Sequence, residues 1–261
     1  MNGLTYFLVA LFSTIIGATA GVGGGVIIKP VLDLLGDYDV KTIGVLSAIT
    51  IFSMTVVSVG KHIIGKTKIK GKIAVFLAFG SVFGGYLGDE AMNRILSVMD
   101  KSFVTLIQNG ILSVLMILIF IYVMKRDTIR SFKTENIGIS IATGFLLGLI
   151  SSFLGIGGGP LNVAVFMLVF SFDTKTSAVC SLITILFAQI AKLVTVGTGT
   201  GFASFDLSVL PFMVVAAIAG GFIGTKLNRM LPEKQITKVF NVVLVLVFLI
   251  CVYNMGRAVI L

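Results

Sequence analysis

The chain has 261 residues, of which 57% are hydrophobic and only 12% charged, about half the charged fraction of an ordinary soluble domain. A mean hydropathy of +1.10 leaves too little polar surface to coat a globule, so a soluble enzyme is excluded and an all-α polytopic membrane protein is predicted. The net charge is +9. Because the basic residues cluster in short loops between apolar runs, this excess indicates membrane orientation and no nucleic-acid partner.

Ten apolar stretches follow one another along the chain and predict helices. They are 4–20, 25–36, 42–60, 73–88, 102–124, 137–154, 159–170, 176–196, 207–225 and 236–256. The stretches 25–36 and 159–170 are too short to span a bilayer, since 12 helical residues cover only ~18 Å. Each follows a glycine cluster, at 21–25 and 155–159. Glycine-rich backbone at membrane depth must be buried in protein or line a cavity, so we predict two half-helices inside the protein.

The second half of the chain repeats the first. A shift of 134 residues lays cluster 155–159 on cluster 21–25 without a gap and lays 173–176 (DTKT) on 39–42 (DVKT). Further along the offset drifts, and the GGxxG segment 84–88 pairs with 220–224, then 93–94 with 228–229. The GGxxG segments predict close helix packing. We predict repeats at 1–124 and 137–261, joined by a basic linker at 125–136.

Loop charge predicts how the repeats are oriented. Loops 61–72, 125–135 and 226–238 are rich in Lys and Arg, whereas 37–41, 89–101 and 197–206 lean acidic. The positive-inside rule places the first three loops in the cytoplasm. That placement requires each glycine hairpin to enter and return on one side. The sequence therefore predicts two inverted repeats, each a glycine-broken re-entrant helical hairpin plus three transmembrane helices. A fully crossing hairpin would make the repeats parallel.

Inverted repeats with broken helices are the arrangement by which secondary transporters build one central site. Backbone N–H groups ahead of each half-helix, with the helix dipole behind them, suit a small oxyanion. The predicted main-chain donors are Gly23, Gly24, Gly25, Gly157, Gly158 and Gly159. Close packing of helices is the alternative role for these glycines.

Polar side chains in the apolar segments complete the predicted substrate shell. The hydroxyl pairs at i and i+3 are Ser47 with Thr50 and Ser181 with Thr184; the other candidates are Lys29, Asn162 and Gln189. The hydroxyls either line the site or bond back to carbonyls of their own helices, and Gln189 either contacts ligand or joins helices. Asp33, four residues after Lys29, is placed to neutralise it. Lys192, the other lysine in an apolar segment, either serves function or snorkels to the surface.

The duplicated glycine cluster also carries a family resemblance. Gly17-x3-Gly21-x-Gly23-Gly24-Gly25-x4-Pro30 and Gly148-x6-Gly155-Ile156-Gly157-Gly158-Gly159-Pro160 resemble the sulfite exporter TauE/SafE family of membrane permeases. The resemblance, which extends to the DxKT and GGxxG segments, implies movement of sulfite, sulfonates or related sulfur anions across the bacterial cytoplasmic membrane.

The expected function is thus a secondary transporter, acting as an exporter, of a small sulfur-containing anion by alternating access. No carboxylate is expected in the midplane segments apart from Asp33, so no proton relay is predicted. No cofactor and no metal site are predicted, and the expected partners are the anion and the lipid bilayer, with a homodimer left open. An anion channel is one alternative. The other is a membrane sulfurtransferase using Cys180 or Cys251, which lack a nearby base.

Overall fold

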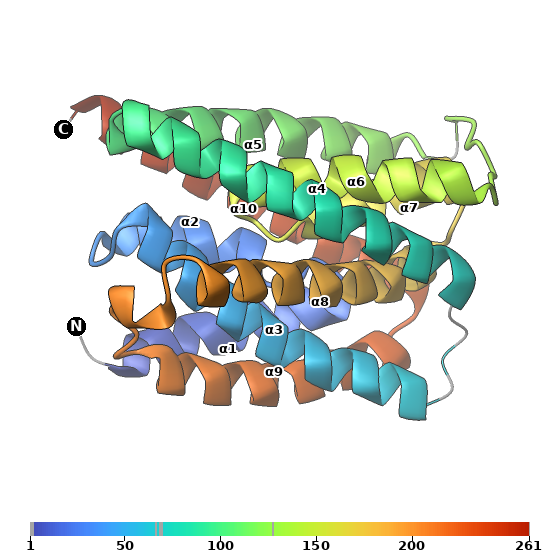
Figure 1. Ribbon diagram of the computed structural model, residues 1–261. Helices are drawn as coiled ribbons and strands as arrows, with labels where there is room; N and C mark the ends of the chain where they lie inside the picture. The colour runs from blue at the N-terminus through green and yellow to red at the C-terminus, as the bar shows by residue number, and fades with distance from the viewer. Residues whose placement is uncertain (1–2, 66, 68–69, 127, 261) are drawn as a thin grey trace.

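The computed structural model describes residues 3–65, 67, 70–126 and 128–260, and within them the fold is an all-helical bundle without strands (Figure 1). The helices are α1 (Gly3–Ala20), α2 (Gly25–Leu35), α3 (Val40–Ile64), α4 (Gly71–Val98), α5 (Lys101–Met124), α6 (Ile137–Leu154), α7 (Gly159–Phe170), α8 (Thr174–Thr198), α9 (Leu210–Met230) and α10 (Glu233–Ile260). A 3₁₀ turn, η1, covers Phe202–Ser204. Eight helices, all except α2 and α7, are long and apolar enough to cross a membrane among the residues described. The prediction of a polytopic helical membrane protein is confirmed.

Local sequence explains where the helices begin and end. Asp39 caps α3, where its Oδ1 accepts from the Lys41 N–H at 2.8 Å, and its counterpart Asp173 caps α8 by accepting from the Thr176 N–H at 2.8 Å. Pro160 lies in the first turn of α7, where its missing N–H leaves no bond unmade. The DxKT segments shared by the two halves are therefore paired helix starts.

Several helices extend beyond the apolar runs that predict them. α4 continues to Val98, through a segment predicted as part of an outer loop. α3 includes Lys61 and His62, and only the residues between Met230 and Glu233 separate α9 from α10. An apolar run marks only the part of a helix that lies in the hydrocarbon core, whereas the helix itself continues through charged residues near the membrane surface. The loop limits 89–101, 61–72 and 226–238 are corrected accordingly; residues 66, 68–69 and 127 of the predicted basic loops lie outside the described part.

Each glycine hairpin begins and ends at one end of the bundle. Near the start of α1, the Tyr6 hydroxyl donates to Asp37 Oδ2, just beyond α2, at 2.5 Å. In the second half, the segment before α6 lies beside the end of α7, where the Phe132 N–H donates to the Leu168 carbonyl at 3.0 Å. These contacts have the geometry that a re-entrant hairpin requires.

The two hairpins approach from opposite ends. The connections α3–α4, α5–α6 and α9–α10 lie together at the right of Figure 1, whereas both termini lie at the left. Ion pairs of Lys70 with Glu135 (3.8 Å) and Arg126 with Glu233 (3.3 Å) join the right-hand connections. All three predicted basic loops therefore share one end, which we call the basic end. The opposite end carries Asp37 and the links α4–α5 and α8–α9.

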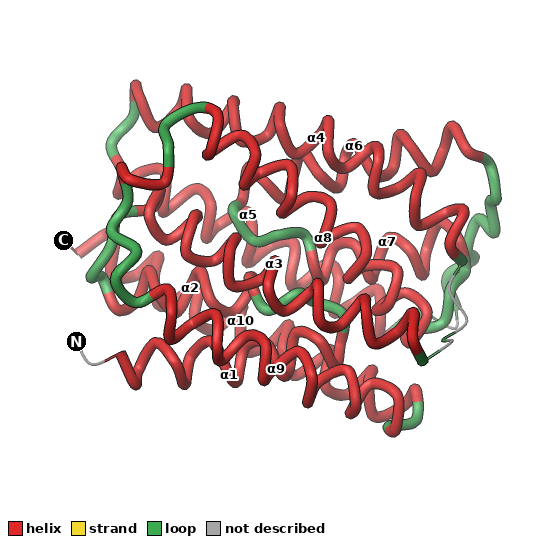
Figure 2. The backbone as a smooth tube through the Cα atoms, turned by 60° about the horizontal axis from the view of Figure 1, so that its bottom comes forward, coloured by secondary structure: helices red, strands yellow, loops and turns green. Residues whose placement is uncertain are grey.

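Glycines bring the first helix of each half against the fourth helix of the other. A β-carbon at Gly84 of α4 would collide with the Phe145 carbonyl of α6, and one at Gly224 of α9 with the Ile15 carbonyl of α1. The two pairs, α4 with α6 and α1 with α9, run side by side in both views (Figures 1 and 2). The predicted packing role of the GGxxG segments is confirmed. This exchange of partners interlocks the halves.

Candidate functional site

The two glycine loops meet at the centre of the bundle and pack on each other reciprocally. A β-carbon at Gly25 of the first loop would lie 3.0 Å from the Ile156 carbonyl oxygen of the second. One at Gly159 of the second loop would collide with the Val22 carbonyl of the first. Gly24 and Gly158, with φ of 74° and 84°, adopt the left-handed conformation that side chains disfavour. The loops need glycine for both reasons.

Of the six glycines predicted as oxyanion donors, Gly157 lines a void in the structure. The other five, Gly23, Gly24, Gly25, Gly158 and Gly159, have protein atoms where a β-carbon would point, and they are absent from the lining of the cavities described next. In this conformation the first glycine loop is thus packed against protein on all sides, and the second loop borders open space on one side.

A cavity of about 1050 Å³ runs into the bundle from the end opposite the basic loops. Its walls come mainly from α3, α4 and α8, with Tyr86 and Phe187 among the apolar lining residues. At its deep end lie Lys29, Gln108 and Gly155. The cavity therefore connects one face of the molecule with the backbone of the second glycine loop.

A smaller compartment of about 20 Å³ adjoins that deep end, and Ser47, Gln189 and Gly157 line it. Ser47 Oγ and Gln189 Oε1 are buried without a hydrogen-bond partner. A space of this size holds a single water or one ligand oxygen. Unpaired buried polar atoms cost free energy, so this compartment has the character of a polar subsite.

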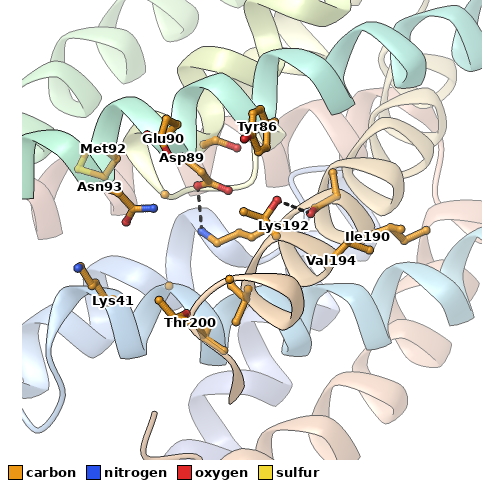
Figure 3. Close-up of a pocket in the computed structure, with 18 of the residues that line it drawn as sticks. Lys41, Tyr86, Asp89, Glu90, Met92, Asn93, Ile190, Lys192, Val194 and Thr200 are labelled. Carbon is orange, nitrogen blue, oxygen red and sulfur yellow. Dashed lines mark hydrogen bonds and ion pairs between the residues drawn. The ribbon is translucent and has the colours of Figure 1, made fainter. Parts of the chain in front are cut away.

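Lys192 and Asp89 form an ion pair at the junction of the two spaces. Lys192 Nζ of α8 lies 3.6 Å from Asp89 Oδ1 of α4, and the side chains are only 18% and 14% exposed. Figure 3 shows the two side chains reaching toward each other across the cavity. Lys192 borders both spaces. Lys192 therefore does not snorkel to the membrane surface. Asp89 is a carboxylate within α4, although the boundaries of the apolar runs place this residue in a loop.

Lys29 is held by two groups at the deep end. Its Nζ donates to Gln108 Oε1 at 2.7 Å and lies 3.7 Å from Asp33 Oδ2, which confirms the predicted neutralisation by Asp33. Its aliphatic chain packs on Gly155. Gln108, on α5, also donates to the Phe153 carbonyl at 2.8 Å. A fixed, neutralised lysine is thus part of the cavity floor, and Gln108 is a contact that sequence spacing does not indicate.

The remaining predicted side chains lie in the packed part of the bundle, away from the cavity and its compartment. Thr50 donates to Leu46 O at 2.7 Å and Thr184 to Cys180 O at 3.1 Å, so both bond back to their own helices. Ser181 Oγ donates to Gly21 O at 2.7 Å. Asn162 lies beside Gly158, with its Oδ1 unpartnered. The structure brings Lys29, Ser47, Gly157 and Gln189 together around accessible space. It leaves the other predicted side chains away from that space: Thr50, Asn162, Ser181 and Thr184.

Both cysteines are fully buried in the structure, each 0% exposed, and both are free thiols. Among the described residues no group of three or more His, Cys, Asp or Glu is placed to hold a metal ion. If the cysteines have no chemical role, the double variant Cys180→Ser with Cys251→Ser is expected to keep at least half of the wild-type transport activity, because neither sulfur borders the cavity. Flux measured in reconstituted vesicles checks this, and loss of flux by folded protein would return the sulfurtransferase alternative.

A cavity that reaches broken helices in a bundle of membrane-length helices is typical of membrane transporters. A family model described as Sulfite exporter TauE/SafE matches residues 6–250. The chain belongs to this family of membrane transporters.

Two curated relatives match along almost their full length. "Probable membrane transporter protein YunE" of Bacillus subtilis is 25% identical over 269 residues, covering 95% of this chain and 96% of the relative. "Probable membrane transporter protein MJ0441" of Methanocaldococcus jannaschii is 24% identical over 246 residues, covering 88% and 87%. "Sulfite exporter TauE/SafE family protein 5" of Arabidopsis thaliana is 36% identical over 101 residues, 38% of this chain and 22% of the relative. No solved structure matches the chain.

Proposed function

We propose that the protein is a secondary transporter that exports a small sulfur-containing anion, such as sulfite or an organosulfonate, across the cytoplasmic membrane by alternating access. The observation that carries the proposal is the deep end of the cavity. There Lys192 adjoins the unpartnered Ser47 hydroxyl and the Gln189 side chain. The ammonium group, the hydroxyl and the Gln189 Nε2 group supply a positive charge and polar hydrogens to an oxyanion, whereas Gln189 Oε1 only accepts.

The size of the compartment supports one position for the proposed anion. Because about 20 Å³ admits only one oxygen, the body of the anion lies in the main cavity beside Lys192. One oxygen then enters the compartment toward Ser47 and Gln189. Asp89 is the resting counter-ion of Lys192, and the anion competes with it for the ammonium group.

The part of the bundle between the glycine loops and the basic end, which we call the closed half, is tightly packed. This packing favours alternating access over a channel. Beyond the compartment, toward the basic end, Gly221 packs on the Met54 carbonyl and Ser181 is bonded to Gly21. A channel needs a continuous path, whereas a transporter is open on one side at a time. With the basic end in the cytoplasm, the cavity faces outward.

Export fits the electrical driving force. A membrane potential that is negative inside favours the exit of an anion by about 2.3 kcal/mol per charge per 100 mV. Net export therefore needs no coupling ion, which agrees with the pairing of the carboxylates near the cavity with cations: Asp33 and Asp89 pair with lysines, and Glu90 with Arg94.

Flux of radiolabelled sulfite, thiosulfate, sulfate and sulfoacetate into proteoliposomes tests the proposed function. We expect saturable flux of one of these anions. Gln189→Leu should raise its half-saturation concentration roughly 5–20-fold, because one buried hydrogen bond to a charged group is lost.

The matched control is Thr195→Val, which also borders the cavity on α8 but bonds back to the Ala191 carbonyl; it should leave half-saturation within about two-fold, as expected away from a binding contact. Absence of flux for all four anions by folded protein would contradict the proposed substrate class.

A further inference from the structure

Buried polar atoms without partners gather at the basic end of the bundle. They are His62 Nε2 on α3, Ser177 Oγ on α8, and Thr225 Oγ1 and Asn228 Oδ1 on α9, and all four residues are 0% exposed. Their helix ends meet, since Lys175 Nζ donates to the Arg229 carbonyl at 3.0 Å and Arg229 lies against Gly65 after α3. Such a concentration of unsatisfied groups is costly in a permanently closed core.

The sequence repeat relates these residues to the walls of the open cavity. The shift of 134 residues carries Ser58 to Lys192 and His62 to Val196. In the drifted part, Gly88-Asp89 pairs with Gly224-Thr225, and Asn93 with Asn228. All four counterparts, Asp89, Asn93, Lys192 and Val196, line the open cavity. Ser177 alone pairs with a residue outside that lining, Ile43.

One contact between a glycine loop and a neighbouring helix is made in the closed half and is absent from the open half, the part of the bundle that holds the cavity. In the closed half Gly21 packs on the backbone of Ala178, and Ser181 Oγ donates to the Gly21 carbonyl at 2.7 Å. The corresponding residues of the open half are Gly155, Gly44 and Ser47. Gly155 and Gly44 both border the cavity, and Ser47 Oγ has no partner. The same joint is therefore shut on one side of the glycine loops and open on the other.

Resting on the proposed function, we propose that His62, Ser58, Thr225 and Asn228 line a second anion chamber, which is closed in this conformation and opens at the basic end. Opening breaks the bond from Ser181 to Gly21, and closure of the first cavity lets Ser47 donate to the Gly155 carbonyl. The Ser58 and Thr225 hydroxyls and the His62 imidazole suit a small oxyanion as donors, whereas Asn228, whose Nδ2 donates to the Thr19 carbonyl at 2.7 Å, contributes an unpaired acceptor to the wall.

The second chamber differs from the first in its charges. The pair Lys192–Asp89 has the uncharged counterparts Ser58 and Thr225. The cations Lys61, Lys175 and Arg229 instead stand at the basic end, where Lys61 Nζ lies 4.4 Å from the centre of the Phe222 ring. An anion arriving from this end meets a positive entrance and, among the described residues, no competing buried carboxylate, so we expect half-saturation concentrations to differ between the two faces.

Thiol labelling tests the chamber. In the background Cys180→Ser with Cys251→Ser, Thr225→Cys and Ser58→Cys report on the second chamber and Thr195→Cys on the open cavity. A membrane-impermeant maleimide is added to one face of oriented vesicles at a time. We expect Thr225→Cys and Ser58→Cys to react from the face opposite to that of Thr195→Cys. If neither reacts from that face in protein that exchanges anions, the chamber does not exist.

The wild-type chain supplies a readout that needs no substitution, because His62 is its single histidine. Diethyl pyrocarbonate modification of the His62 peptide, followed by mass spectrometry, should proceed in native protein much faster than global unfolding. Protection of His62 until the protein unfolds overturns the proposal. Modification of His62 in native protein that moves none of the sulfur anions supports the second chamber and contradicts the proposed function. Flux of a sulfur anion with His62 protected supports the proposed function and contradicts the second chamber.

Discussion

Replacing Gly159 with alanine is expected to lower the melting temperature of the protein by roughly 4–10 °C, the largest stability effect we predict for a single methyl group. The added β-carbon would occupy the position of the Val22 carbonyl. Val22 is 0% exposed, so its backbone has no free space into which to move. Because Gly159 does not have a positive φ, the loss would be purely steric and would report the crossing of the two loops.

Thiol-dye unfolding assays suit this measurement, since both cysteines are buried and the chain has no tryptophan. Gly60→Ala is the matched control: Gly60 lies inside α3 with no atom within 4 Å of the added carbon, and alanine favours helix by up to about 1 kcal/mol. Its melting temperature should stay the same or rise. Equal melting temperatures for the two variants would contradict the packed crossing of the loops.

Replacing Lys192 with glutamine is expected to raise the half-saturation concentration of the proposed anion substrate roughly 10–100-fold, the largest effect on binding that we predict. The variant removes the cation at the junction of cavity and compartment and leaves Asp89, 3.6 Å away in the wild type, to repel the anion. Initial rates of anion uptake at varied concentration measure the change.

Two further variants separate binding from general charge effects. The double variant Lys192→Gln with Asp89→Asn should recover part of the affinity, because the uncompensated carboxylate is gone. Lys41→Gln removes an exposed lysine that also lines the cavity and should change half-saturation no more than about three-fold, as for a screened surface charge. Equal effects of Lys192→Gln and Lys41→Gln would show that Lys192 acts only through the overall field.

The fold was largely predictable because lipid imposes a simple rule on sequence. Every helix was indicated by an apolar run, and the half-helices α2 and α7 by their length and preceding glycines. Helix ends were less predictable, since charged segments such as residues 89–98 continue α4 beyond its apolar run. The inverted repeat remains a prediction from loop charge, with which the position of both hairpins agrees.

The candidate site was only partly predictable because repeated sequences need not adopt the same local conformation. Ser47 and Ser181 are equivalent in sequence, yet one is unpartnered beside a cavity and the other is bonded to Gly21. Sequence treats both glycine clusters alike, but only the second borders open space. Pairs such as Lys192–Asp89 join residues far apart in the chain, and no local pattern indicates them.

Counterflow in proteoliposomes tests the central claim most directly, namely that one anion site is exposed alternately to the two sides. Vesicles are loaded with radiolabelled sulfite or with the anion that gives saturable flux, and unlabelled anion is added outside with the membrane potential clamped at zero. The account predicts that external anion accelerates the exit of label, in a saturable way, and that Lys192→Gln weakens this acceleration. Exit that is unaffected by external anion and does not saturate would contradict alternating access and indicate a channel.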